Sequence, residues 1–163
     1  MVVDFSSHEL VILRGILIKF GGLFPKTAEK IKYVGCGREI GVNYNDKAVT
    51  KSWKEFQKRE IARGWCDYFA GCVFICIDEQ SFRSIFYRER IIYDAVWILV
   101  HELGHFLNDF LIIRGLDDDI LHNPEEFAEN FCYWFLIPRK FWETVQFELD
   151  LLLRQETARQ TST

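Results

Sequence analysis

The spacing of apolar and polar residues along the chain predicts a largely helical protein. Ser6 and Ser7 precede the first apolar-periodic run and are typical of a helix N-cap. Ser52 stands in the same position before a second run, which Gly64 would end, and Asn123-Pro124 before a third. Together the patterns predict helices over about 7–20, 53–63, 92–110, 125–137 and 139–156.

Short runs of β-branched and aromatic residues predict a few strands between these helices. The clearest covers 72–77, and weaker ones cover 31–34 and 40–44. Residues 79–90 fit neither pattern. Helices combined with a few strands indicate an α+β fold, and no repeat or linker divides the chain. We therefore expect one domain over 1–156, followed by a polar and frayed tail over 157–163.

Composition narrows the class of protein. A length of 163 residues with 49% hydrophobic residues is enough for one packed core. The net charge of -4 gives no general attraction to nucleic acid, and we read the basic stretch 51–63 as a solvated helix face. The apolar run 10–24 is interrupted by Arg14 and Lys19, so no membrane association is expected.

The five cysteines favour a reducing compartment. Their number is odd and the first residues lack the basic segment of a secretory signal, so we expect reduced thiols and a cytoplasmic protein. Cys72 and Cys76 are separated by three residues within the strongest strand pattern, without a second pair at zinc-ribbon distance. We interpret both as small buried residues rather than as metal ligands.

The segment His101-Glu102-Leu103-Gly104-His105 carries the clearest chemistry. On a helix, His101 and His105 lie one turn apart on the same face and can offer two imidazoles to one zinc ion. Glu102 lies one residue round the helix, close enough to act as a base toward water held at the metal. This pattern is typical of zinc-dependent hydrolases, with the metal as Lewis acid.

A catalytic zinc site needs a third protein ligand. A third histidine on the same helix is excluded, because position 108 is asparagine and position 111 is leucine. Asp109 continues the ligand row but would splay away along the helix axis, and His122 lies in a loop. The acidic residues of the following helix remain, and we favour ligation by one of the set Glu125, Glu126 and Glu129. If Glu125 is the ligand, Glu129 can accept a hydrogen bond from a ligand histidine.

The segment 125–138 resembles the E-x-x-A-[ND]-x-F-A-x-x-L-L-M-P signature of the ImmA/IrrE family of zinc metallopeptidases. Ala128, Phe131, Leu136 and Pro138 fall in register with it. Glu129 stands where the family usually has aspartate or asparagine, and Cys132 where it has alanine. With the H-E-x-x-H motif, the resemblance covers about 94–138.

The resemblance implies a zincin-like α+β domain with a small sheet beside the H-E-x-x-H helix. It also implies zinc as the cofactor, with His101, His105 and Glu125 as ligands and Glu102 as the catalytic glutamate. Some family members cleave a DNA-binding repressor, so the expected partner is a protein or peptide, such as a repressor. The alternative function is that of a metal-stabilised protein-binding module without enzymatic activity. In such a module His122 or Asp109 would be the fourth ligand of the metal.

Overall fold

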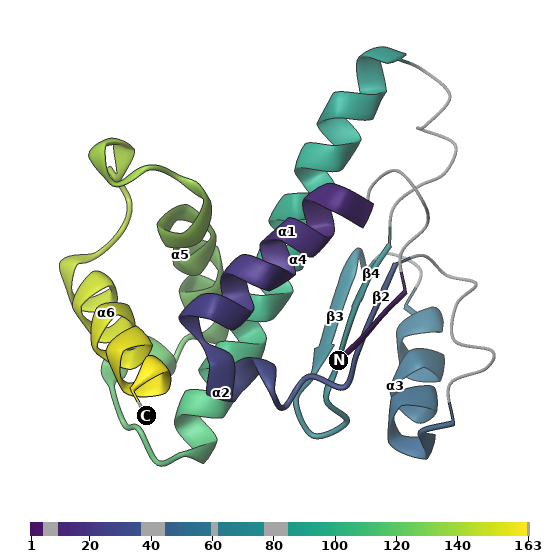
Figure 1. Ribbon diagram of the computed structural model, residues 1–163, viewed down its shortest axis with the longest axis horizontal. Helices are drawn as coiled ribbons and strands as arrows, with labels where there is room; N and C mark the ends of the chain where they lie inside the picture. The colour runs from purple at the N-terminus through teal and green to yellow at the C-terminus, as the bar shows by residue number, and fades with distance from the viewer. Residues whose placement is uncertain (5–9, 37–44, 60–61, 77–84, 163) are drawn as a thin grey trace.

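A four-stranded mixed sheet packs against one side of the longest helix, α4 (Figure 1). The computed structural model describes residues 1–4, 10–36, 45–59, 62–76 and 85–162, and of residues 4, 10 and 85–93 the backbone alone. The strands are β1 (Val2–Asp4), β2 (Tyr33–Cys36), β3 (Gly64–Asp67) and β4 (Cys72–Ile75). The α-helices are α1 (Leu10–Leu23), α2 (Pro25–Ala28), α3 (Lys47–Gln57), α4 (Ile85–Ile113), α5 (Pro124–Leu136) and α6 (Phe147–Thr161). The short 3-10 helices are η2 (Asp119–Leu121) and η3 (Arg139–Phe141).

The sheet has the order β1-β2-β4-β3. β1, β2 and β4 run parallel. β3 precedes β4 in the chain, lies antiparallel beside it and is joined to it by a tight hairpin. Gly71 ends that hairpin with a φ of 71°, a backbone conformation that favours glycine. β3 is therefore an edge strand of this sheet, and it lies directly against α4.

Buried residues cover both faces of the sheet, which explains the continuous apolar run of β4. Val73 and Ile75 point toward the main core, which α1, α4, α5 and α6 also supply. Cys72 and Phe74 point the other way, into a smaller core with Trp53 of α3. The domain is thus layered, with α3 outside the sheet and the remaining long helices on the opposite side (Figure 1). This confirms the expected α+β class, with the small sheet beside the motif helix.

The second helix differs from its prediction. α3 covers Lys47–Gln57, and its N-cap is Asp46, whose carboxylate accepts hydrogen bonds from the backbone amides of Ala48 and Val49 at 3.0 and 3.2 Å. Ser52, predicted as the cap, is buried and accepts a 2.7 Å hydrogen bond from the Trp65 indole. Gly64, predicted to end this helix, instead begins β3.

Two other helices differ from their predicted bounds. α4 begins at Ile85 instead of near 92. The predicted helix over 139–156 is replaced by η3 and by α6, which starts at Phe147 and continues to Thr161. The segment expected to fray after 156 stays helical because Gln160 is buried and bonded to Thr27 of α2. The Ser6–Ser7 cap and the strand over 40–44 lie outside the described residues.

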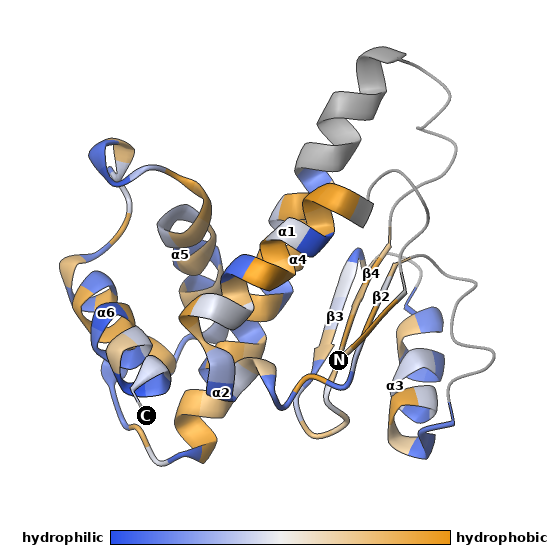
Figure 2. Cartoon of the chain, viewed as in Figure 1, coloured by the Kyte–Doolittle hydropathy of each residue, from blue (hydrophilic) through white to orange (hydrophobic). Residues whose placement is uncertain are grey.

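Within the described part of the chain, one segment is long and apolar enough to cross a membrane, Asp94–Ile113 of α4. More than half of its residues are buried inside the domain. Figure 2 shows this apolar helix running through the centre of the fold, with α1 and the sheet beside it. Its apolar character is therefore accounted for by the protein core.

Candidate metal centre

The two histidines of the motif lie side by side on α4. Their Nε2 atoms are 3.1 Å apart, and the rings meet nearly edge to face. Both side chains are about one fifth exposed, at 21% for His101 and 18% for His105. Burial, and then the positive charge that His101 can carry, lower the pKa of His105. The environment thus favours the neutral imidazole, the form that binds a metal ion.

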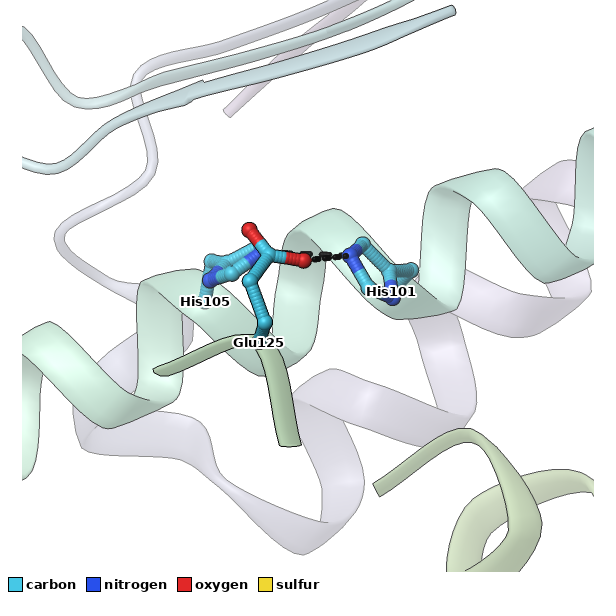
Figure 3. A group of neighbouring side chains, drawn as sticks. All are labelled: His101, His105 and Glu125. Carbon is cyan, nitrogen blue, oxygen red and sulfur yellow. Dashed lines mark hydrogen bonds and ion pairs between the residues drawn. The ribbon is translucent and has the colours of Figure 1, made fainter. Parts of the chain in front are cut away.

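Glu125 joins the two histidines from the first turn of α5 (Figure 3). Its two carboxylate oxygens lie 3.3 Å from Nε2 of His101 and 3.2 Å from Nε2 of His105. The start of α5 is fixed by the Asn123 side chain, which accepts a hydrogen bond from the Glu126 amide, and by Pro124 at the first helical position. The predicted start of this helix is confirmed.

The three side chains form a group that could hold a metal ion. Tetrahedral ligands about 2.0–2.1 Å from zinc lie roughly 3.3 Å from one another. The two imidazole nitrogens are 3.1 Å apart, and each lies 3.2 or 3.3 Å from a different oxygen of the Glu125 carboxylate, so the separations are close to that spacing. The residues therefore fit a divalent ion of the zinc type. Glu125, with 79% of its side chain exposed, leaves the group open toward solvent.

Glu102 lies beside this group but is turned toward the sheet. Burial, and next the negative charge of Glu125, raise the pKa of Glu102 from 4.5 to about 8. Its side chain packs directly on the backbone of Gly64 in β3, where a Cβ would come within 2.7 Å of its Cγ and Cδ atoms. A cation nearby would favour the ionised carboxylate and oppose the effect of burial.

Close packing of α4 on α5 brings the group together. Gly104 of the motif lies against α5, and a Cβ on it would be 3.0 Å from the Cα of Ala128 and 3.1 Å from the Phe131 ring. Glu129, one turn after Glu125, places Oε2 3.7 Å from Nδ1 of His101. α5 thus places a carboxylate near each of the two ring nitrogens of that histidine.

The other residues considered as ligands stay outside the group. His122 is exposed and pairs with Asp117 at 2.8 Å. Asp109 is half-buried on α4, where burial, and then the charge of Asp67, raise its pKa. Glu126 instead receives hydrogen bonds from the side chains of Asn123 and Gln146.

The strand cysteines contribute no ligand to the group. Cys72 is fully buried, and this burial is the main cause that raises its pKa to about 12. Cys76 is only half-buried. The prediction that both are buried residues is therefore confirmed for Cys72 and wrong for Cys76. Cys66, Cys72 and Cys132 are free thiols.

Comparisons with protein-family models, with curated proteins and with solved structures each gave no match. The site is therefore defined by its own geometry. That geometry supports a zincin-like arrangement, with an H-E-x-x-H helix and a glutamate from the next α-helix, and does not by itself assign an activity.

Proposed function

We propose that this chain is a zinc-dependent peptidase in which His101, His105 and Glu125 bind the metal and Glu102 transfers protons. The observation that carries the proposal is the convergence of the three side chains. The two Nε2 atoms lie 3.1 Å apart, each within 3.3 Å of an oxygen of the Glu125 carboxylate, and one donor atom from each residue lies within 4.8 Å of the other two. In the described part of the chain, no fourth side chain completes the group. An open position is what distinguishes catalytic from structural zinc sites.

Bound zinc would supply Lewis acidity toward a peptide carbonyl and lower the pKa of water to about 7. Glu102 would accept a proton from the attacking water and deliver it to the amine that leaves when the C–N bond breaks. The charge of the bound metal would favour the ionised carboxylate of Glu102, the form that can accept a proton. Glu129 would orient His101 through Nδ1.

The resemblance of 94–138 to ImmA/IrrE metallopeptidases supports a narrower version of the proposal. On this basis the substrate is a partner protein, such as a DNA-binding repressor, in the cytoplasm. Free thiols at Cys66, Cys72 and Cys132 are compatible with a reducing compartment. The acidic net charge of -4 fits a protein substrate better than direct binding to nucleic acid.

The substitution Glu102→Gln tests the proposal, since it keeps the shape of the side chain and removes its ability to take up a proton. We expect the variant to bind zinc and to retain a partner protein that co-purifies with it. Wild-type enzyme loaded with zinc should then cleave that partner into fragments detectable by mass spectrometry, and the variant should not. Glu126→Gln, a neighbouring exposed carboxylate, is the control and should cleave normally.

Two results would contradict the proposal. Equal cleavage by the Glu102→Gln variant would remove Glu102 from the mechanism. A partner that binds the zinc-loaded wild type and stays intact would indicate a metal-stabilised binding module.

A further inference from the structure

The edge strand β3 meets the motif helix at a residue without a side chain. Gly64 is the first residue of β3 and pairs with Ile75 of β4. Because side chains alternate along a strand, Gly64 shares a face with Cys66, which packs on the main core, while Trp65 packs in the smaller core. The face of β3 at Gly64 is therefore the face toward α4.

Glu102 occupies the volume that a side chain at position 64 would need. A Cβ on Gly64 would lie 2.7 Å from both Cγ and Cδ of Glu102, and closer still to Oε1. Such separations are far shorter than carbon–carbon contacts of about 3.5–4.0 Å. Any residue larger than glycine at position 64 must displace the Glu102 side chain or separate β3 from α4.

The helix itself is poorly able to retreat. Leu99 and Leu103, which flank Glu102 on α4, are fully buried in the main core. Glu102 thus lies between a helix that is held by its buried neighbours and the edge of the sheet, so a methyl group at position 64 would shift its side chain rather than the helix.

We propose that Gly64 is a positioning residue: it forms a seat on which the Glu102 side chain lies, and it thereby fixes the carboxylate beside the metal-binding group. The inference rests on the proposed function, since a fixed carboxylate matters for proton transfer. A misplacement of about 1 Å in a reacting group can lower a rate roughly 100-fold. A glycine at the sheet edge would leave room for the Glu102 side chain and bring no side chain of its own into the site.

The contact can be tested without any assay of activity, by a double-mutant cycle on the full chain in the presence of a chelator. The four proteins are wild type, Gly64→Ala, Glu102→Ala and the double variant, and urea unfolding is followed by circular dichroism. In the wild-type background, Gly64→Ala should lower the unfolding midpoint by about 1 M. In the Glu102→Ala background it should have little effect, because the colliding atoms are gone.

Equal midpoint shifts in the two backgrounds would overturn the proposal, because Gly64 would then act independently of Glu102. If Gly64→Ala does not fold, the double variant decides. If the double variant folds as Glu102→Ala does, the positioning role of Gly64 is supported. If neither Gly64→Ala nor the double variant folds, that role is overturned. Gly15→Ala is a control at an open position of α1, where nothing lies within 4 Å of a Cβ, and it should shift the midpoint equally in the wild-type and Glu102→Ala backgrounds.

Zinc binding and kinetics distinguish this inference from the proposed function. Gly64→Ala should lower the affinity for zinc by less than about tenfold, which is the smallest loss expected when the residues that support metal ligands are disturbed. With the intact partner protein that the wild type cleaves as substrate, the kcat of the Gly64→Ala variant should be about 100-fold lower, while its KM changes little. If the effect of Gly64→Ala on the unfolding midpoint depends on Glu102 but the wild type cleaves nothing, the contact between Gly64 and Glu102 stands and the proposed peptidase activity is refuted. If the wild type cleaves its partner and the Gly64→Ala variant has the same kcat, the positioning role of Gly64 is refuted and the proposed peptidase activity stands.

Discussion

Oε2 of Glu129 lies 3.7 Å from Nδ1 of His101, on the side of the ring away from the Nε2 atom that faces Glu125. A carboxylate at the distal nitrogen of a metal-binding histidine fixes the ring and its tautomer. We therefore predict that Glu129→Ala weakens zinc binding about 10–100-fold, measured by competition with a chromophoric chelator. Glu126→Ala, on the exposed side of the same helix, is the control. Equal affinities of the two variants would exclude a role for Glu129 at the metal.

The approach of α4 to α5 at Gly104 leads to a prediction about stability. A methyl group at this position would press on Ala128 and Phe131, both fully buried, so Gly104→Ala should destabilise the protein by about 1–3 kcal/mol. Gly15→Ala, in an open position of α1, should instead stabilise it by about 0.4–1 kcal/mol. Urea unfolding measures both. A neutral Gly104→Ala variant would show that the two helices can separate without cost.

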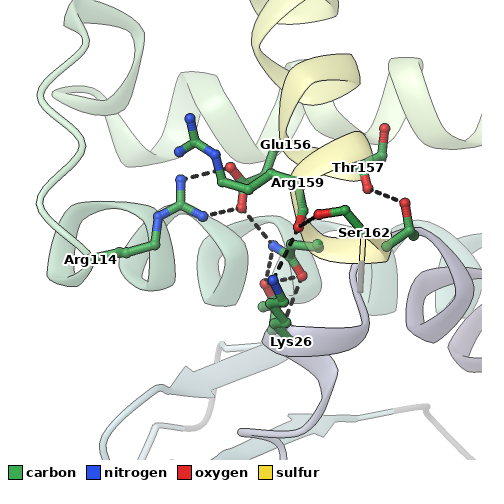
Figure 4. Close-up of polar contacts among 9 residues, drawn as sticks. Lys26, Arg114, Glu156, Thr157, Arg159 and Ser162 are labelled. Atoms are coloured by element: carbon green, nitrogen blue, oxygen red, sulfur yellow. Dashed lines mark hydrogen bonds and ion pairs between the residues drawn. The ribbon is translucent and has the colours of Figure 1, made fainter.

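A buried polar network connects the end of α4 to α6 (Figure 4). The Arg114 guanidinium donates two hydrogen bonds to the Glu156 carboxylate, one of them 2.7 Å long, and Gln160 donates a third at 2.9 Å. Burial raises the pKa of Glu156, but the hydrogen bonds from Arg114 and Gln160 and the nearby arginine charges outweigh it. The net effect holds the pKa below its ordinary value of 4.5.

This lowered pKa gives the pH dependence of stability a definite sign. Because the folded state binds the proton of Glu156 more weakly than the unfolded state, the contribution is complete above pH 4.5 and is lost as the pH falls through the folded value. Glu156→Gln should therefore flatten the acid limb of stability against pH, measured by urea unfolding. Glu148→Gln, exposed on the same helix, is the control. An unchanged acid limb would contradict the prediction.

Removal of the partner charge is a harsher test of the same network. Arg114→Ala leaves the buried carboxylate of Glu156 without the partly exposed arginine that donates two hydrogen bonds to it, so we expect a loss of about 1–3 kcal/mol in the free energy of unfolding. Arg154→Ala, whose partner Asp150 also bonds to Trp134, is a milder comparison at a more exposed pair. A smaller loss for Arg114→Ala than for Arg154→Ala would contradict the importance assigned to the pair of Arg114 with the buried Glu156.

The sequence predicts the candidate metal-binding group well because most of its geometry is local. His101 and His105 are one helical turn apart, and Asn123-Pro124 fixes the start of the helix that carries Glu125. The selection of Glu125 among three nearby glutamates depends on how α5 crosses α4, which local pattern does not determine. The resemblance to a known signature pointed to Glu125, and the structure brings it to the two histidines.

The residues around Glu102 were not predictable in the same way. Gly64 follows a basic, helix-like segment, so local pattern indicates a helix end, whereas tertiary contacts with β4 and α4 make it part of a strand. Ser52 is likewise a good N-cap by its type, but the Trp65 indole recruits its hydroxyl into a buried hydrogen bond. In both cases long-range packing overrides a local preference.

Metal binding should also stabilise the fold, because the three donors come together only in the folded state. At a zinc concentration 100 times the Kd, the free energy of unfolding should rise by about 2.7 kcal/mol. Thermal unfolding with and without a chelator measures the difference. His105→Asn should abolish the zinc-dependent shift. A shift of equal size in that variant would place the metal elsewhere.

The most direct test is titration of the metal-free protein with Co²⁺, a spectroscopic substitute for zinc, followed by visible absorption. We predict saturation at about one ion per chain, with the intense bands of a four-coordinate site, and loss of these bands in the Glu125→Ala variant. Absence of saturable binding in the wild type, or an unchanged spectrum in Glu125→Ala, would contradict a metal centre formed by His101, His105 and Glu125.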